Sequence, residues 1–160
     1  MVMQARSFDI FLTNVKEDAQ VIWRGLLERG RISEAEFAAA QILNYYRSKD
    51  ELCAPLREAG AVRDAGLRLK SFETMVTACP YRSAWLAGNV PLDEFCKRLV
   101  MTMRTWSNSS FESALDGARA PDERKAICDE MYDGMAAAVR KNPNDYTMEY
   151  VHALIVMQKE

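Results

Sequence analysis

Four cysteines and one histidine are the residues of this chain with the widest chemical repertoire. Cys53, Cys79, Cys96 and Cys128 form no Cys-x-x-Cys pair, and His152 is the only histidine. A tetrahedral zinc site therefore has no local scaffold. We expect the cysteines to be buried free thiols in a reducing compartment. His152 lies within an apolar run, so we expect a buried side chain rather than a catalytic base.

The polar run Ser107-Asn108-Ser109-Ser110 is a second candidate for chemistry. It interrupts a helical pattern with groups that could point into an interior, but no histidine accompanies it. A nucleophilic serine needs an adjacent base, which argues against a serine hydrolase. The charged segment 120–130 is expected to be a solvated helix face with ion pairs inside one helix.

Length and charge limit the remaining classes. The chain has 160 residues, of which 49% are hydrophobic, and a formal charge of -2, which fits one compact domain with a core. Lys and Arg alternate with Asp and Glu, so no basic stripe is available for nucleic acid. Arg6 and Asp9 interrupt the region where a signal peptide needs its apolar core. We expect a soluble, cytoplasmic protein with no membrane segment.

Helix signals dominate the first third of the chain. Apolar residues recur at helical spacing from Val15 to Arg29, after the caps Thr13 and Asn14, and Gly30 closes the pattern. Two further helices are predicted to start near residues 34 and 49, because Ser-x-x-Glu capping boxes precede both positions.

Strand signals occur twice. Residues 61–72 alternate apolar and polar side chains, with Gly66 as a candidate bulge. Residues 146–157 close the chain with an apolar run that is typical of a strand buried on both faces, in the middle of a sheet.

The segment between these strands predicts an irregular but packed stretch over residues 77–89, followed by two long helices. Pro121 opens the second of them and the turn at 142–145 ends it. The first carries an apolar stripe of Phe95, Leu99, Val100, Met103, Trp106 and Phe111, and the second a stripe of Ile127, Met131, Met135, Ala138 and Val139.

Four stretches carry a resemblance to a known family. They are Val21-Ile22-Trp23 followed by LLERGRISEAEF, then NYYRSKDELCAPLREAGAV, RLVMTMRTWSNSSFESAL, and the closing YTMEYVHALIVMQKE. In order and spacing they resemble the C-terminal part of the SABATH family, the S-adenosylmethionine-dependent methyltransferases that cap carboxylates of small metabolites.

The resemblance implies a fold. Family members have a seven-stranded sheet in the order 3-2-1-4-5-7-6 and a helical cap over the acceptor. This chain would then be α/β, a mostly helical cap plus a three-stranded remnant, strands 5-7-6, of a Rossmann-like sheet. Residues 1–3, 61–72 and 146–157 would supply those strands, within a single domain whose cap elements cover about 15–59 and 80–141. No glycine-rich loop for the methyl donor precedes them.

The resemblance also implies a binding pocket without a catalytic residue. Trp23 resembles the tryptophan that flanks the acceptor carboxylate, and Tyr45 or Tyr46 matches an aromatic lining position. Met103 and Trp106 occupy the corresponding face of the cap helix. A core role for these side chains is the competing interpretation. S-adenosylmethionine is implied as cofactor, but the chain has no motif that would bind it.

The expected partners follow from the missing half. A remnant sheet exposes an edge that invites association, so we expect a homo-oligomer, a separately encoded complementing half, or a truncated gene product, acting on a small acid or phenol. A second hypothesis is a non-catalytic oligomeric module that binds a small ligand or regulates. A third, an unrelated small helical protein, would be favoured if the last twelve residues were helical.

Overall fold

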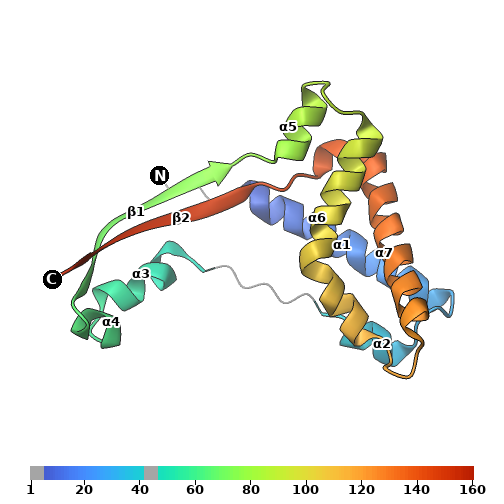
Figure 1. The fold of residues 1–160 in the computed structure, drawn as a ribbon, viewed down its shortest axis with the longest axis horizontal. Coiled ribbons are helices and arrows are strands. Elements are labelled where there is room, and N and C mark those ends of the chain that lie inside the picture. The colour runs from blue at the N-terminus through green and yellow to red at the C-terminus, as the bar shows by residue number, and fades with distance from the viewer. Residues whose placement is uncertain (1–5, 42–46) are drawn as a thin grey trace. The chain divides into compact units, whose positions relative to one another are not determined.

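The computed structural model describes the backbone at residues 6–41 and 47–160, and the side chains at 15, 17–41 and 47–160. The chain divides into two compact units, each made of two separate segments (Figure 1). The helical unit comes from residues 1–42 and 78–149, and the sheet unit from 43–77 and 150–160. The second segment of the helical unit is therefore an insertion between the two strands of the sheet unit.

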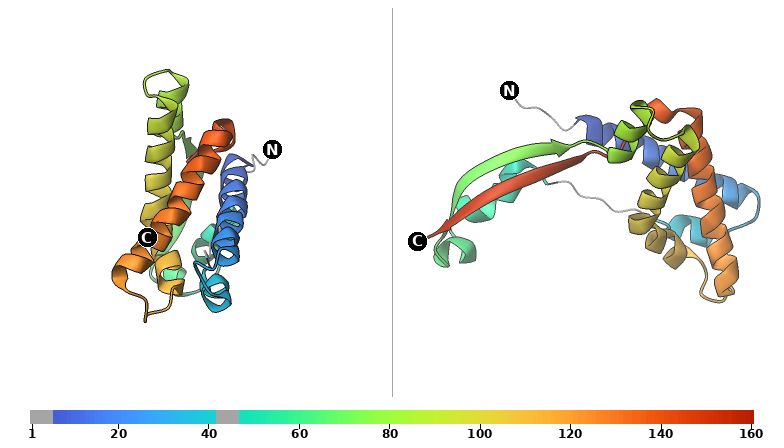
Figure 2. Two further views of the ribbon diagram at one scale, coloured as in Figure 1. Left: turned by 90° about the vertical axis from the view of Figure 1, so that its right-hand side faces the viewer. Right: turned by 45° about the horizontal axis from the view of Figure 1, so that its top comes forward.

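Three long helices dominate the helical unit: α1 (Arg6–Glu28), α6 (Leu92–Ala114) and α7 (Pro121–Lys141). Helix α7 contacts both α6 and α1, and Figure 2 shows the three side by side. The shorter elements are α2 (Glu34–Ala39), α5 (Pro80–Leu86) and the 3-10 turn η1 (Pro143–Asp145). The largest fully buried side chains of this unit are Leu26, Phe95, Leu99, Met103, Ile127, Met131 and Val139.

The predicted C-terminal end of helix α1 is confirmed, whereas its predicted N-terminal end is wrong. It ends just before Gly30, which has φ 68°, and the amide of Gly30 donates to the Leu27 carbonyl at 2.8 Å. It begins at Arg6, so Thr13 and Asn14 lie inside the helix and are not its caps. Helix propensity disfavours these two residues only weakly in an interior, so they do not end a pattern that continues on both sides.

Both capping boxes are confirmed. In each, the glutamate amide donates to the serine hydroxyl and the serine amide donates to the glutamate carboxylate. The stretch predicted to be irregular contains α5, which has Pro80 at its start and stacks Trp85 on Phe95 at 5.0 Å. Helix α6 also runs on through Ser107, which was expected to interrupt it, because the Ser107 hydroxyl bonds the Met103 carbonyl at 2.8 Å within the same helix.

The sheet unit contains α3 (Lys49–Arg57), α4 (Ala61–Asp64), β1 (Leu67–Thr77) and β2 (Tyr150–Lys159). The two strands pair in antiparallel register, with Phe72 opposite Ile155. The strand predicted over residues 61–72 begins six residues late, because α4 occupies its first part. Cross-strand pairing extends β1 as far as Thr77.

Gly66 has a different role from the predicted bulge, which lies between Leu69 and Ser71. Gly66 has φ 77°, and a Cβ added there would lie 2.9 Å from the backbone oxygen of Glu160. Its own carbonyl accepts the Glu160 amide at 2.9 Å. Only glycine fits this close backbone approach without strain.

The chain is mixed α and β and mostly helical, as expected. The sheet has two strands in the part of the chain that the structure describes, and the third strand, expected at residues 1–3, lies outside it. Strand β2 is not buried on both faces as predicted: Leu154 is 46% and Val156 48% exposed. The last twelve residues are not helical, since Tyr150–Lys159 form β2, so this observation does not favour the third hypothesis. No described helix is long and apolar enough to cross a membrane.

Candidate functional site

Trp23 lies at the centre of an aromatic cluster inside the helical unit. Its side chain is buried, and its ring centroid is 5.0 Å from that of Phe111, tilted by 50°. Phe111 in turn meets Tyr132 edge-on at 6.2 Å. Helices α1, α6 and α7 each supply one of these rings, so the cluster joins the three long helices. Such ring pairs add about 0.5–1.5 kcal/mol beyond the area they bury.

The indole N–H of Trp23 has no hydrogen-bond partner among the described residues, although the nitrogen is buried. A buried donor left unpaired costs about 1–3 kcal/mol, and a tryptophan in a purely structural core normally finds an acceptor. Among the described residues, the helical unit therefore holds a buried donor without an acceptor. Chemically, it suits an acceptor atom such as a carboxylate oxygen.

Tyr132 and Ser107 form the polar part of the same cluster. Their hydroxyl oxygens are 2.8 Å apart, and the Arg104 guanidinium lies 4.9 Å from the centre of the Tyr132 ring. Burial is the main cause that raises the pKa of Tyr132 to about 12. Tyr132 is therefore neutral at physiological pH and serves as a hydrogen-bonding group rather than a base.

The other predicted pocket residues separate into three groups. Met103 is buried in the same core as Trp23, so the structure brings these two into one interior. Trp106 is 37% exposed and lies at the surface of α6. Tyr45 and Tyr46 lie outside the described residues.

The predicted burial and free state of the cysteines are confirmed, whereas the predicted burial of His152 is wrong. All four cysteines are free and buried, and desolvation raises the pKa of the Cys96 and Cys128 thiols, which keeps them protonated and inert. His152 is exposed on β2 and stacks against Tyr150 at 6.2 Å. It is not buried because no described element covers that face of the strand. Among the described residues, no group of His, Cys, Asp and Glu could hold a metal ion.

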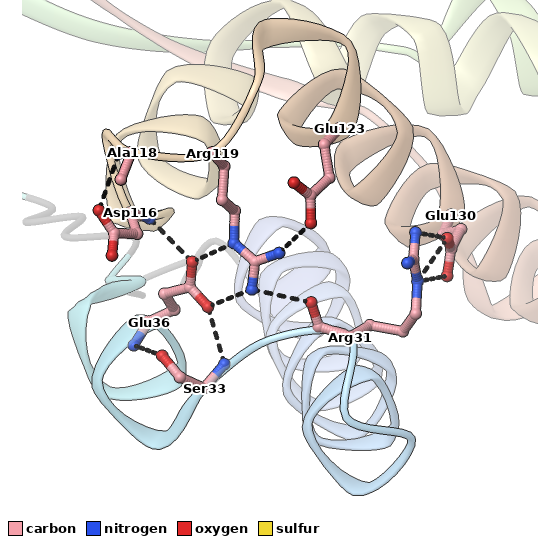
Figure 3. Close-up of polar contacts among 8 residues, drawn as sticks. All are labelled: Arg31, Ser33, Glu36, Asp116, Ala118, Arg119, Glu123 and Glu130. Atoms are coloured by element: carbon pink, nitrogen blue, oxygen red, sulfur yellow. Dashed lines mark hydrogen bonds and ion pairs between the residues drawn. The ribbon is translucent and has the colours of Figure 1, made fainter.

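A buried ion pair links α2 to the loop before α7 (Figure 3). Glu36 is 4% exposed. Arg119 donates to it through two nitrogens, at 2.6 and 2.9 Å. The amides of Ser33 and Asp116 donate to the same carboxylate at 2.7 and 2.8 Å. Arg119 also bonds Glu123 and the Arg31 carbonyl.

These contacts indicate that Glu36 is part of a structural ion pair with Arg119, called the lock below, rather than a catalytic acid. The Arg119 hydrogen bonds are the main cause that holds the pKa of Glu36 well below its usual range. A cavity of about 310 Å³ adjoins the pair, yet both Glu36 oxygens and three Arg119 nitrogens already have partners in the protein. A ligand would have to displace these bonds to bind here.

Sequence reasoning missed this lock. It expected ion pairs within one helix, and Lys125 with Asp129 is such a pair. Glu130, however, binds Arg31 across elements, with 2.9 Å between Oε1 and Nε. The capping box at Glu36 was a partial signal, because it placed a carboxylate at a helix start without identifying the arginine that neutralises it.

The outer edge of β2 is the second candidate region. The Glu160 amide points toward β1, where it donates to Gly66. Because N–H groups alternate along a strand, those of Val151, Ala153 and Ile155 point away from β1. Within the described residues the sheet ends at β2 on this side, and Leu154 and Val156 beside the edge are exposed.

No family model and no curated protein matches the chain.

Proposed function

We propose that this chain is the substrate-capping C-terminal portion of a SABATH-like, S-adenosylmethionine-dependent methyltransferase, acting on a small carboxylate or hydroxyl. No motif within these 160 residues would hold the methyl donor, so residues outside them would form the donor site. Alone, the chain is inactive. The observation that carries the proposal is β2, a strand with apolar side chains on both faces and, among the residues that the structure describes, no strand beside its outer edge.

A strand of this composition is stable in water only when its sheet continues. Val151, Ile155 and Met157 lie on one face of β2, and Leu154 and Val156 lie on the other. A donor half whose helices pack over the sheet would cover both faces of β2. A strand beside β2, the place that the resemblance gives to the strand of residues 1–3, would satisfy the N–H groups of Val151, Ala153 and Ile155 that point away from β1. The insertion of a helical unit between β1 and β2 supports the same arrangement, in which a cap interrupts the sheet.

The unpaired indole of Trp23 supports a role for the helical unit in acceptor binding. A carboxylate that accepts this N–H gains a charge-assisted hydrogen bond in an apolar surrounding. That bond would orient the acceptor rather than activate it, because a carboxylate is already ionised at neutral pH.

The reaction requires little from the protein beyond orientation. A carboxylate oxygen forms a bond to the methyl carbon of S-adenosylmethionine while the sulfur–methyl bond breaks, and the sulfur keeps the electron pair. No proton moves when the acceptor is a carboxylate, and proximity accounts for the rate.

A second candidate is a non-catalytic, oligomeric ligand-binding or regulatory module derived from the same fold. The sequence of β2 favours it, because the strand is self-complementary. Antiparallel pairing with a second copy centred on Leu154 sets Ala153 opposite Ile155 and Val151 opposite Met157. No like charges then face each other within the strand.

Methyl transfer to a panel of small aromatic acids tests the enzyme proposal. The chain is expressed alone, and also together with the donor-binding half of a SABATH enzyme, and labelled methyl from S-adenosylmethionine is counted in the ester product. We expect transfer only in the combined sample. Calorimetry of the chain alone with S-adenosylmethionine should give no heat, and micromolar binding would contradict a missing donor half.

Variants at Ala153 and Trp23 test whether the β2 edge and the indole donor are needed for methyl transfer. Ala153→Pro removes an N–H from the free edge of β2 and should abolish transfer, whereas Ala153→Val keeps the N–H and should retain it. Trp23→Phe removes the indole donor and should reduce kcat/KM about tenfold or more. A combined sample with no transfer, whose chain alone is a dimer that Ala153→Pro converts to monomer, would favour the non-catalytic module.

A further inference from the structure

The sheet unit contains a cavity lined by three arginines, well separated in the sequence from the Trp23 cluster. Each arginine comes from a different element: α3, α4 and β1. The cavity has a volume of about 670 Å³, within the range of small-molecule sites. Its lining is Leu56, Arg57, Arg63, Arg68, Leu69 and Glu160.

The arginines are only partly neutralised. Arg57 pairs with Asp50 at 3.2 Å, and Arg68 pairs with Glu160 at 3.1 Å. Both carboxylates are well exposed, so these pairs are weak. Arg63 has no carboxylate partner in the described parts of the chain, and it donates only to the Arg57 carbonyl at 3.4 Å. The side chains of the three arginines together with those of Asp50 and Glu160 carry a net charge of +1, the charge of Arg63.

Three arginines that line one cavity repel one another unless carboxylates or a bound anion offset their charge. The fold nevertheless positions them: the Arg68 guanidinium donates to the Arg63 carbonyl at 2.6 Å and to the Leu67 carbonyl at 3.2 Å. Carbonyl groups orient an arginine without cancelling its charge. We propose that this cavity binds the phosphoryl group of a small molecule.

The arrangement favours a phosphoryl group over a carboxylate. A carboxylate presents two oxygens in one plane and satisfies one or two guanidinium forks. A phosphoryl group presents three oxygens in different directions, which suits donors that arrive from three elements. Nucleic acid is not the source of the phosphate, because the chain as a whole is acidic, with a formal charge of -2.

Glu160 provides a second test of the proposal, because its neutralisation should have the opposite effect on anion binding to that of Arg63. The Glu160 carboxylate pairs with Arg68. An anion that enters the cavity must therefore displace this carboxylate or bind beside a like charge. Neutralising Glu160 should therefore tighten anion binding, whereas neutralising Arg63 should weaken it. An unspecific attraction of anions to surface charge would not show these effects at Glu160 and Arg63 rather than at other charged residues.

Calorimetric titration of the full chain with pyrophosphate, without metal and at constant ionic strength, tests the site. We expect a Kd of about 1 mM or tighter for the natural chain. Arg63→Gln should weaken binding about tenfold or more, since it removes charge-assisted hydrogen bonds. Glu160→Gln should tighten binding about threefold. The control is Arg98→Gln, an exposed arginine paired with Glu94 on α6, which should stay within about twofold of the natural chain.

Several results would overturn the proposal. These are no pyrophosphate binding by the natural chain at 10 mM, equal weakening by Arg63→Gln and Arg98→Gln, or no tightening by Glu160→Gln. Malonate binding as tight as pyrophosphate binding would overturn the phosphoryl assignment. Hydrogen exchange of the β2 amides confirms that each variant keeps its sheet. The result is independent of methyl transfer, because no residue of the Trp23 cluster or of the β2 edge is altered.

Discussion

The helical unit encloses its apolar side chains, whereas the sheet unit leaves many of its own exposed. Leu99 and Ile127 of the helical unit are fully buried, whereas Leu154 and Met157 of β2 are 46% and 51% exposed. Both units contain similar residue types, so composition does not explain the difference. It follows from topology: three long helices enclose a core among themselves, whereas two strands with short helices have too few layers to do so. The helical unit is complete alone, and the sheet unit requires an additional surface.

Leucine truncation in each unit should show this contrast most strongly. Leu99→Ala removes a fully buried side chain and should cost about 3 kcal/mol of unfolding free energy. Leu154→Ala should change the stability of the chain alone by less than about 0.5 kcal/mol. All three tryptophans lie in the helical unit, so their fluorescence in urea measures that unit. Hydrogen exchange of the β2 amides measures the other.

Equal costs for the two truncations would contradict the contrast, because they would mean that β2 is already covered. Met101→Ala offers a matched control on a long helix, since Met101 is 54% exposed. It should behave like Leu154→Ala, which separates the effect of burial from that of secondary structure.

The lock between Glu36 and Arg119 should give the next largest effect. Glu36→Gln removes the charge that neutralises Arg119 and should cost about 2 kcal/mol. Loss of one partner of a fully buried pair costs about 3–5 kcal/mol, and Arg119 is partly exposed and retains Glu123. Urea unfolding followed by tryptophan fluorescence measures the loss. Lys125→Gln breaks an exposed pair and should cost under about 0.5 kcal/mol.

The same carboxylate should make the stability of the helical unit dependent on pH. The folded pKa of Glu36 is lowered, so its contribution is complete above the unfolded pKa of about 4.3 and is lost as the pH falls toward the folded value. The natural chain should therefore lose stability below about pH 5 more steeply than Glu36→Gln does. Parallel curves for the two proteins between pH 5 and pH 3 would show that the lock contributes nothing.

Sequence patterns predicted where helices start, but they did not predict which residues join the helices to other elements. Serine caps and apolar spacing depend on neighbours in the chain, so the starts of α2, α3 and α7 were predictable. The partner of Glu36 is Arg119, which is 83 residues away, and no local pattern identifies it. Trp23 and Met103 could be assigned to one interior from their helical stripes, but the unpaired indole N–H depends on every neighbour at once. The exposure of His152 depends on which elements cover β2, which its apolar run does not determine.

The close approach of α1 and α7 should give the smallest effect. A Cβ added to Gly134 would lie 2.8 Å from Cγ2 of Ile22. Gly134→Ala gains about 1 kcal/mol of helix propensity but overpacks a contact, which typically costs about 1–3 kcal/mol. We expect a net loss of about 1 kcal/mol, measured by urea unfolding. Gly117→Ala, where nothing lies within 4 Å, is the neutral control.

In the Ile22→Ala background, Gly134→Ala should instead stabilise the chain, because the added methyl then fills vacated space. Stabilisation by Gly134→Ala alone would show that the helical unit, like the sheet unit, still has room between its elements.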